Sequence, residues 1–171
     1  MHDDCNMRNY IAELSKDLGS MLLSCGATVT VAESCTGGGL ASAITEIDGS
    51  SKWFGVGFVT YSDLFKHKLL KVPTRLIQEE GSVSEAVVRS MVEGAVNLTS
   101  AEYGLAVSGI AGPTGGRANK PVGTVWFAWK SAEGTDAKRL VFSGDRGMVR
   151  AQAIEFSLKQ LLHIVKRSNT V

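Results

Sequence analysis

Residues 28–39, TVTVAESCTGGG, contain the pattern that most strongly indicates the fold of this chain. An apolar, β-branched run ends at Ala32, and a serine and three glycines follow closely. Residues 105–116, LAVSGIAGPTGG, show the same arrangement of a short apolar run and a glycine-rich turn. Glycine at a strand end permits positive φ and close approach to a ligand, and open α/β sheets bind ligands beyond the carboxyl ends of their strands. The two turns therefore predict an α/β sheet with an anionic or nucleotide-like ligand at one edge.

Hydrophobic periodicity around these turns predicts alternating helices and strands. Helices are expected at residues 7–25, 39–47, 63–70, 75–80 and 146–165, with one more beginning at the N-cap Ser84. Strands are expected at residues 27–32, 54–61, 104–109, 122–129 and 138–142, the last two joined by a turn at 133–136. That short connection makes the last two strands antiparallel neighbours. The order of elements predicts a three-layer α/β/α sandwich around a mixed sheet.

Size and composition exclude several classes of protein. A length of 171 residues predicts one domain, residues 1–171, and 44% hydrophobic with 20% charged residues is typical of globular proteins. The net charge of +1 gives no field to attract nucleic acid or a membrane surface, and no apolar run reaches the ~18 residues of a membrane span. Three cysteines without a CxxC pair, and a polar N-terminus unlike a secretory signal, indicate a cytoplasmic protein. The three histidines lack metal-ligand spacing, so we expect no metal and no other cofactor.

Four side chains are candidates for chemistry. Ser34 follows a strand and precedes a helix, where it is a nucleophile, a ligand-binding hydroxyl or a plain N-cap. Tyr61 and Lys66 flank the end of the strand at 54–61, and Lys66 can act as a base if burial lowers its pKa, although a surface lysine is commoner. Arg146 either holds a phosphate or carboxylate or forms a salt bridge at a helix start. The candidate substrate-binding positions in the two turns are Thr36, Gly37, Gly38, Ser108, Gly109, Ala111, Gly112, Gly115 and Gly116.

Six linked motifs closely resemble those of the CinA C-terminal-domain family, the nicotinamide-nucleotide amidohydrolases. They are residues 32–38, 49–51, 59–62, 81–85, 108–113 and 120–125, in that order. The resemblance implies a five-stranded mixed sheet between helices, with one antiparallel strand. It also implies hydrolysis of the carboxamide of nicotinamide mononucleotide to nicotinate mononucleotide and ammonia, in pyridine-nucleotide recycling. Larger relatives carry a molybdopterin-binding-like domain for which this chain has no room, so it resembles the stand-alone form.

The family is described as using a serine, a tyrosine and a lysine, which by motif fall on Ser51, Tyr61 and Lys66. Ser34 is the competing serine. Such a set provides a nucleophile and a proton carrier for amide hydrolysis, and N–H groups of the glycine turns are expected to bind the oxyanion. Asp63 stands where relatives commonly have asparagine, and its charge is expected to raise the pKa of Lys66.

Two other functions fit parts of this pattern. A non-catalytic nucleotide-binding module would keep the glycine turns and Arg146 but would have no use for Tyr61 together with Lys66. A serine-lysine hydrolase acting on peptides or β-lactams needs SxxK and KTG-like motifs, which the chain lacks. The oligomeric state is left open by the sequence, a homo-oligomer included.

Overall fold

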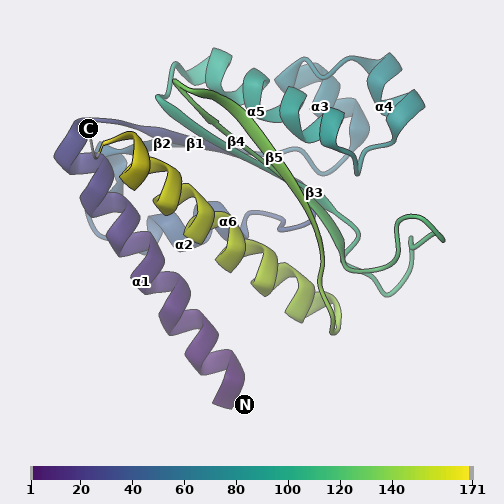
Figure 1. Cartoon of the computed structure of the whole chain (residues 1–171), viewed down its shortest axis with the longest axis horizontal. Helices are drawn as coiled ribbons and strands as arrows, with labels where there is room; N and C mark the ends of the chain where they lie inside the picture. The colour runs from purple at the N-terminus through teal and green to yellow at the C-terminus, as the bar shows by residue number, and fades with distance from the viewer. Residues whose placement is uncertain (1, 170–171) are drawn as a thin grey trace.

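Figure 1 shows the computed structural model of the chain, which describes residues 2–169, with side chains from residue 6 onward. Its five strands are β1 (Val29–Glu33), β2 (Phe54–Val59), β3 (Tyr103–Gly109), β4 (Thr124–Ser131) and β5 (Gly134–Val141). They form one sheet in the order β2-β1-β3-β4-β5. β1 pairs in parallel with β2 and β3, whereas β4 is antiparallel to both β3 and β5. The mixed sheet with one antiparallel strand is therefore confirmed.

Helices cover both faces of this sheet. They are α1 (His2–Cys25), α2 (Gly39–Thr45), α3 (Asp63–Leu70), α4 (Thr74–Glu80), α5 (Glu85–Thr99) and α6 (Arg146–Ser168), with a short 3-10 turn, η1 (Ser50–Lys52). In Figure 1, α1, α2 and α6 lie on one side of the sheet and α3, α4 and α5 on the other. The three-layer α/β/α architecture agrees with the prediction.

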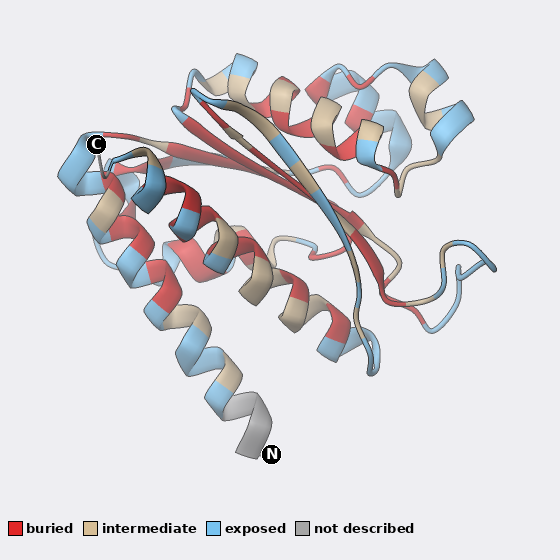
Figure 2. Ribbon diagram, viewed as in Figure 1, coloured by how far each residue is buried: buried red, intermediate tan, exposed pale blue. Residues whose placement is uncertain are grey.

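Two apolar cores hold the layers together, one on each face of the sheet, and the middle strands are largely coloured as buried in Figure 2. The larger core joins α1, α2 and α6 to the sheet. On the other face the strands contribute alanines, Ala32, Ala106 and Ala128, to a core that α5 completes. Gly94 of α5 lies so close to the carbonyl of Leu70 that any side chain there would collide with it. This close packing fixes the end of α3, and with it the residues that α3 carries.

The β4–β5 hairpin differs from its prediction. The turn was expected at residues 133–136, but only Ala132 and Glu133 connect the strands, and Ser131 pairs with Gly134. Thr135 and Asp136, which were predicted to lie in the turn, extend the strand instead. β5 is an edge strand with exposed positions, so polar residues are tolerated in it and give no turn signal.

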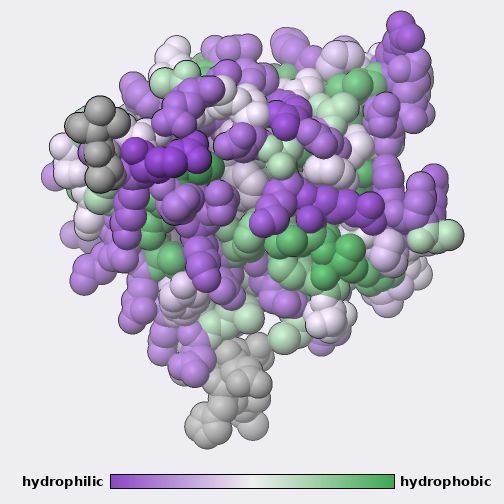
Figure 3. Space-filling model, viewed as in Figure 1, coloured by the Kyte–Doolittle hydropathy of each residue, from purple (hydrophilic) through white to green (hydrophobic). Residues whose placement is uncertain are grey.

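The surface visible in Figure 3 is mostly hydrophilic, with apolar side chains gathered in smaller patches. Within residues 2–169, no helix combines the length and the apolar character needed to cross a membrane. Over the same residues, no group of three or more His, Cys, Asp or Glu side chains is arranged to hold a metal ion.

Candidate active site

The carboxyl ends of β1, β2 and β3 meet at one edge of the sheet, where a cavity of about 250 Å³ opens. Its walls come from the turns after β1 and β3, the start of α3, the loop before α5 and the start of α6. Its lining residues are Ser34, Cys35, Tyr61, Asp63, Lys66, Ser82, Val83, Ser108, Gly109, Ala111 and Arg146. Seven of the sequence-predicted site residues are therefore brought together: Ser34, Tyr61, Lys66, Ser108, Gly109, Ala111 and Arg146.

Lys66 and Ser34 form the centre of this cavity. Lys66 lies four residues before Leu70 on α3, so both side chains point inward, and Lys66 is only 1% exposed. Its Nζ donates to Ser34 Oγ at 3.3 Å and lies 3.5 Å from Asp63 Oδ1. Burial lowers the pKa of Lys66, and the nearby Asp63 carboxylate opposes that shift. A desolvated amine beside a serine hydroxyl is the arrangement of a base with its nucleophile.

The first glycine-rich turn is held by a carboxylate that sequence reasoning missed. Glu33 is fully buried, and its side chain accepts from the N–H groups of Gly38 and Leu40 at 3.1 Å and Ala41 at 2.9 Å. These are donors at the start of α2, which otherwise lack partners within a helix. The turn therefore folds around Glu33, and this fold presents Ser34 to the cavity.

Because of these contacts, some backbone N–H groups of the predicted binding residues in the first turn are already used within the turn. Gly38 N–H is taken by Glu33, and Gly37 N–H donates to Ser34 O at 3.0 Å. Both glycines have positive φ, 59° and 93°, so they shape the turn. The Thr36 side chain is fully buried, and its Oγ1 has no hydrogen-bond partner among the described residues. Within residues 2–169, the N–H groups of Cys35 and Thr36 donate to no other backbone group.

The second glycine-rich turn forms the opposite wall. Ser108 Oγ donates to Ser82 O at 2.8 Å, which joins the end of β3 to the loop before α5. A side chain on Gly109 would stand 3.1 Å from Cys35 Sγ and 2.9 Å from Thr124 O, so glycine lets the two turns approach each other. Gly112, Gly115 and Gly116 lie beyond the lining of this cavity, and Gly115 faces a neighbouring hollow instead.

Tyr61 and Arg146 close the outer side. Tyr61 is 59% exposed, and its Oη accepts from Arg146 Nη2 at 2.8 Å. Arg146 also donates to Gly112 O at 3.0 Å. Arg146 is the first residue of α6, where Asp145 is the N-cap and accepts from Met148 N. The start of α6 is thereby tied to the loops that follow β2 and β3.

Ser51 lies elsewhere. It is exposed in η1, directly before β2, whereas Tyr61 and Lys66 come after β2. A strand of 6 residues spans roughly 20 Å, so Ser51 stands at the opposite edge of the sheet. The expected grouping of Ser51 with Tyr61 and Lys66 is not found, and Ser34 is the serine beside Lys66.

Cys35 also lines the cavity, but it is a buried thiol. Burial raises the pKa of Cys35 to about 12, and the neighbouring Glu33 acts in the same direction. A protonated thiol is a poor nucleophile. Cys35 is free and buried.

Glu33, Ser82 and Val83 are site residues that sequence reasoning did not select. One signal existed for Glu33: a carboxylate at the end of a fully buried strand needs hydrogen-bond partners. Ser82 and Val83 belong to residues 81–85, which predicted a helix start and contributed to the family resemblance but supplied no candidate site residue.

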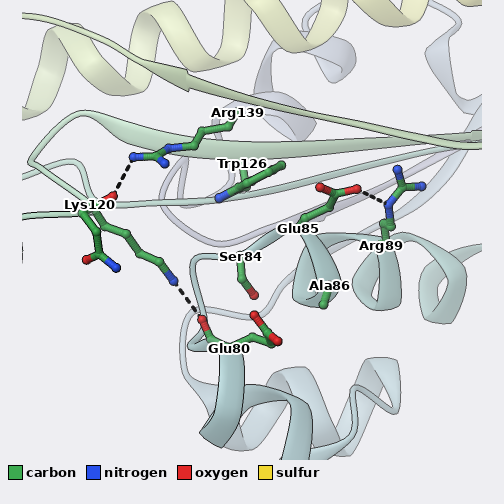
Figure 4. A pocket seen from close by; sticks show the side chains of 9 residues that line it. Glu80, Ser84, Glu85, Ala86, Arg89, Lys120, Trp126 and Arg139 are labelled. Atoms are coloured by element: carbon green, nitrogen blue, oxygen red, sulfur yellow. Dashed lines mark hydrogen bonds and ion pairs between the residues drawn. The ribbon is translucent and has the colours of Figure 1, made fainter.

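A larger hollow of about 460 Å³ lies between α5 and the outer strands (Figure 4). Its charged groups are largely occupied: Arg89 pairs with Glu85 at 2.8 Å, and Lys120 donates to Glu80 O at 2.8 Å. Its one amine, on Lys120, and its one hydroxyl, on Ser84, both donate to backbone carbonyls, so the smaller cavity at Lys66 is the better candidate for catalysis.

Known proteins of one family resemble this chain over most of its length. The sequence profile of the CinA C-terminal domain matches residues 11–165. The chain belongs to this family. The nicotinamide-nucleotide amidohydrolase PncC of Escherichia coli K12 is 49% identical over 152 residues, covering 88% of this chain and 92% of the relative. The protein of the same name from Pseudomonas putida is 48% identical over 154 residues, covering 90% and 96%.

Solved structures match the fold over nearly the whole chain. The competence damage-inducible protein A from Klebsiella pneumoniae superposes with a TM-score of 0.89 at 38% identity, covering 94% of this chain and 99% of that one. A CinA superfamily protein from Escherichia coli gives a TM-score of 0.87 at 39% identity, covering 90% of each chain. The three-layer fold around the five-stranded sheet is therefore that of solved CinA-type proteins.

Proposed function

We propose that this protein hydrolyses the carboxamide of nicotinamide mononucleotide, giving nicotinate mononucleotide and ammonia. The observation that carries the proposal is the buried Lys66 amine 3.3 Å from Ser34 Oγ, at the base of an open cavity. The substrate is suggested by relatives of 48–49% identity that are named nicotinamide-nucleotide amidohydrolases. The chain covers 92% and 96% of those relatives, so the comparison extends over almost their whole length.

Ser34 is the proposed nucleophile and Lys66 its base. Neutral Lys66 takes the proton of Ser34 as Oγ attacks the carboxamide carbon, forming a tetrahedral intermediate. Lys66 then passes this proton to the amide nitrogen, the C–N bond breaks, and ammonia leaves a nicotinoyl ester on Ser34. Lys66 next removes a proton from water, which attacks the ester, and Ser34 recovers its proton as nicotinate forms.

Two backbone groups are proposed to bind the oxyanion. The N–H groups of Cys35 and Thr36 adjoin the nucleophile and donate to no other backbone group within the described residues. In many hydrolases the N–H of the residue after the nucleophile has this role. Glu33 supports it by occupying the N–H groups further along the turn and holding the turn in place.

Tyr61 and Arg146 are proposed to act on the rest of the substrate. Because Tyr61 Oη accepts from Arg146, its own hydroxyl remains available to donate a hydrogen bond to the substrate. A guanidinium has five N–H donors, and the bonds to Tyr61 and Gly112 use two of those on Arg146. The others are proposed to hold the phosphate, which gives a preference for the nucleotide over free nicotinamide.

Ammonia release from nicotinamide mononucleotide by the purified protein tests the proposal. The expected result is turnover without added metal, and much slower turnover of free nicotinamide. Equal turnover of the two substrates would contradict the phosphate contact. Binding of the nucleotide without ammonia release would contradict the enzymatic function and would support a nucleotide-binding module of the same fold.

A further inference from the structure

Asp63 and Ser82 form a small polar cluster at the mouth of the cavity. Asp63 is the first residue of α3, and its Oδ1 accepts from Ser82 Oγ at 2.5 Å. The same oxygen lies 3.5 Å from Lys66 Nζ. The side chain of Asp63 is 53% exposed and that of Lys66 only 2%, so the buried amine has its counter-charge at the surface of the pocket.

Ser82 is itself held in place from the sheet. Its carbonyl accepts from Ser108 Oγ at 2.8 Å, and Ser108 is 1% exposed at the end of β3. The contacts therefore run from β3 through Ser82 to Asp63, and from Asp63 to Lys66 and Ser34. Asp63 Oδ1, the oxygen that both Ser82 and Lys66 contact, therefore links the loop before α5 to α3.

We propose that Asp63 and Ser82 act as a positioning pair, which holds Lys66 Nζ beside Ser34 Oγ and determines the pH range over which Lys66 removes the proton of Ser34. The inference rests on the proposed function. Neither residue needs to touch the substrate, because both act through Lys66.

Asp63 and Ser82 are expected to shift the pKa of Lys66 in opposite directions. The Asp63 carboxylate favours the protonated form of Lys66 and so raises the pKa that burial lowers. Ser82 donates to that carboxylate and competes with Lys66 for the same oxygen. Removing the Asp63 carboxylate should therefore lower the pKa of Lys66, so that the neutral amine forms at lower pH. Removing the Ser82 hydroxyl should strengthen the interaction of Asp63 with the Lys66 ammonium and raise this pKa.

The other groups around Lys66 remain in place in both variants. The Cys35 thiol, after β1, and the Tyr61 hydroxyl, after β2, influence Lys66 more weakly than the Asp63 carboxylate does. Arg146 of α6 lines the same cavity and adds a positive charge. α5, which packs on α3, contributes buried apolar side chains to the core that they share.

The test is the pH dependence of kcat/KM for nicotinamide mononucleotide in Asp63→Asn, Ser82→Ala and the double variant. We expect the acidic limb to move to lower pH in Asp63→Asn, which then keeps several-fold more of its maximal kcat/KM at low pH than the wild type. Ser82→Ala should move the limb to higher pH. The double variant should match Asp63→Asn, because Ser82 acts through Asp63. Asp48→Asn, an exposed carboxylate before η1, is the control and should leave the profile unchanged.

A second measurement separates this inference from the proposed function. The titration of Lys66 Nζ, followed by NMR of ¹⁵N-labelled lysine, does not depend on turnover. The same order of midpoints is expected, Asp63→Asn lowest and Ser82→Ala highest. Midpoints that coincide, or that move in the same direction, would overturn the positioning pair even if the enzyme deamidates the nucleotide. Absence of ammonia release with the expected midpoints would instead refute the proposed function and leave the effect of the pair on Lys66 standing.

Discussion

The turn that carries Ser34 and the turn that carries Ser51 look alike in sequence but have opposite surroundings. Both are short, contain glycine and adjoin a strand. Ser34 follows β1, is 8% exposed and receives a hydrogen bond from a buried lysine. Ser51 precedes β2 and is exposed in a 3-10 turn. A serine becomes a candidate nucleophile through the base that the fold brings to it, not through its local motif.

The Ser34 turn and the Ser51 turn also differ in the side-chain contacts that support them. The Ser34 turn is built on a buried carboxylate that accepts from three backbone N–H groups. The Ser51 turn begins with Gly49 at a φ of 75° and has no side-chain cap. The first turn is therefore held as part of the core, and the second is a surface connection. The predictions below test this contrast, starting with the largest effect.

Ser34→Ala should lower kcat for nicotinamide mononucleotide on the order of 10³-fold or more, because it removes the attacking oxygen. Ser51→Ala is the matched variant and should keep kcat close to that of the wild type. Ammonia release under single-turnover conditions measures both. A large loss in Ser51→Ala with near-full activity in Ser34→Ala would reverse the assignment of the nucleophile.

Lys66→Met should lower kcat to a similar extent without lowering the thermal midpoint. The amine is required as the base, but burying an amine is costly, and methionine fills similar space without that cost. Thermal unfolding and ammonia release are the two measurements. Lys68→Met, at an exposed position on the same helix, should change neither. A marked loss of stability in Lys66→Met would show that this lysine is mainly structural.

Glu33→Ala should destabilise the fold by about 3 kcal/mol, because several buried N–H groups lose their acceptor. Gly49→Ala, the comparable change at the Ser51 turn, should cost only about 1 kcal/mol, from its left-handed backbone conformation. Urea unfolding of both variants gives the comparison. Equal losses would mean that the Ser34 turn does not depend on the buried carboxylate.

The wild-type enzyme should lose kcat/KM as the pH falls through the pKa of Lys66, because only the neutral amine accepts the Ser34 proton. Burial lowers this pKa from its ordinary value of 10.5, so the acidic limb should lie below that pH. A pH profile of the wild type and of Ser51→Ala should give the same limb. A limb at the ordinary lysine value would argue against a desolvated base.

Much of this protein follows from its sequence. The alternation of apolar runs and helical periodicity placed every strand and helix to within a few residues at most boundaries, and the two glycine-rich turns identified the edge of the sheet that carries the cavity. The main error in the elements was the β4–β5 turn, where polar residues of an exposed edge strand resembled a loop. Such features are local, and the chain encodes them over a few neighbouring residues.

Which side chains meet in the cavity was decided by the tertiary structure. Lys66 and Ser34 are 32 residues apart, and Arg146 and Tyr61 are 85 apart, so no spacing rule relates them. The position of Glu33 at the end of an apolar strand is a local signal, but its hydrogen-bond partners are set only when the fold buries it against the start of α2. The family motif favoured Ser51, with Ser34 as the competing serine; the parallel pairing of β1 with β2 put Ser34 at the edge where α3 delivers its lysine and Ser51 at the opposite edge. Contacts between distant segments depend on how layers pack, and packing is a property of the whole chain.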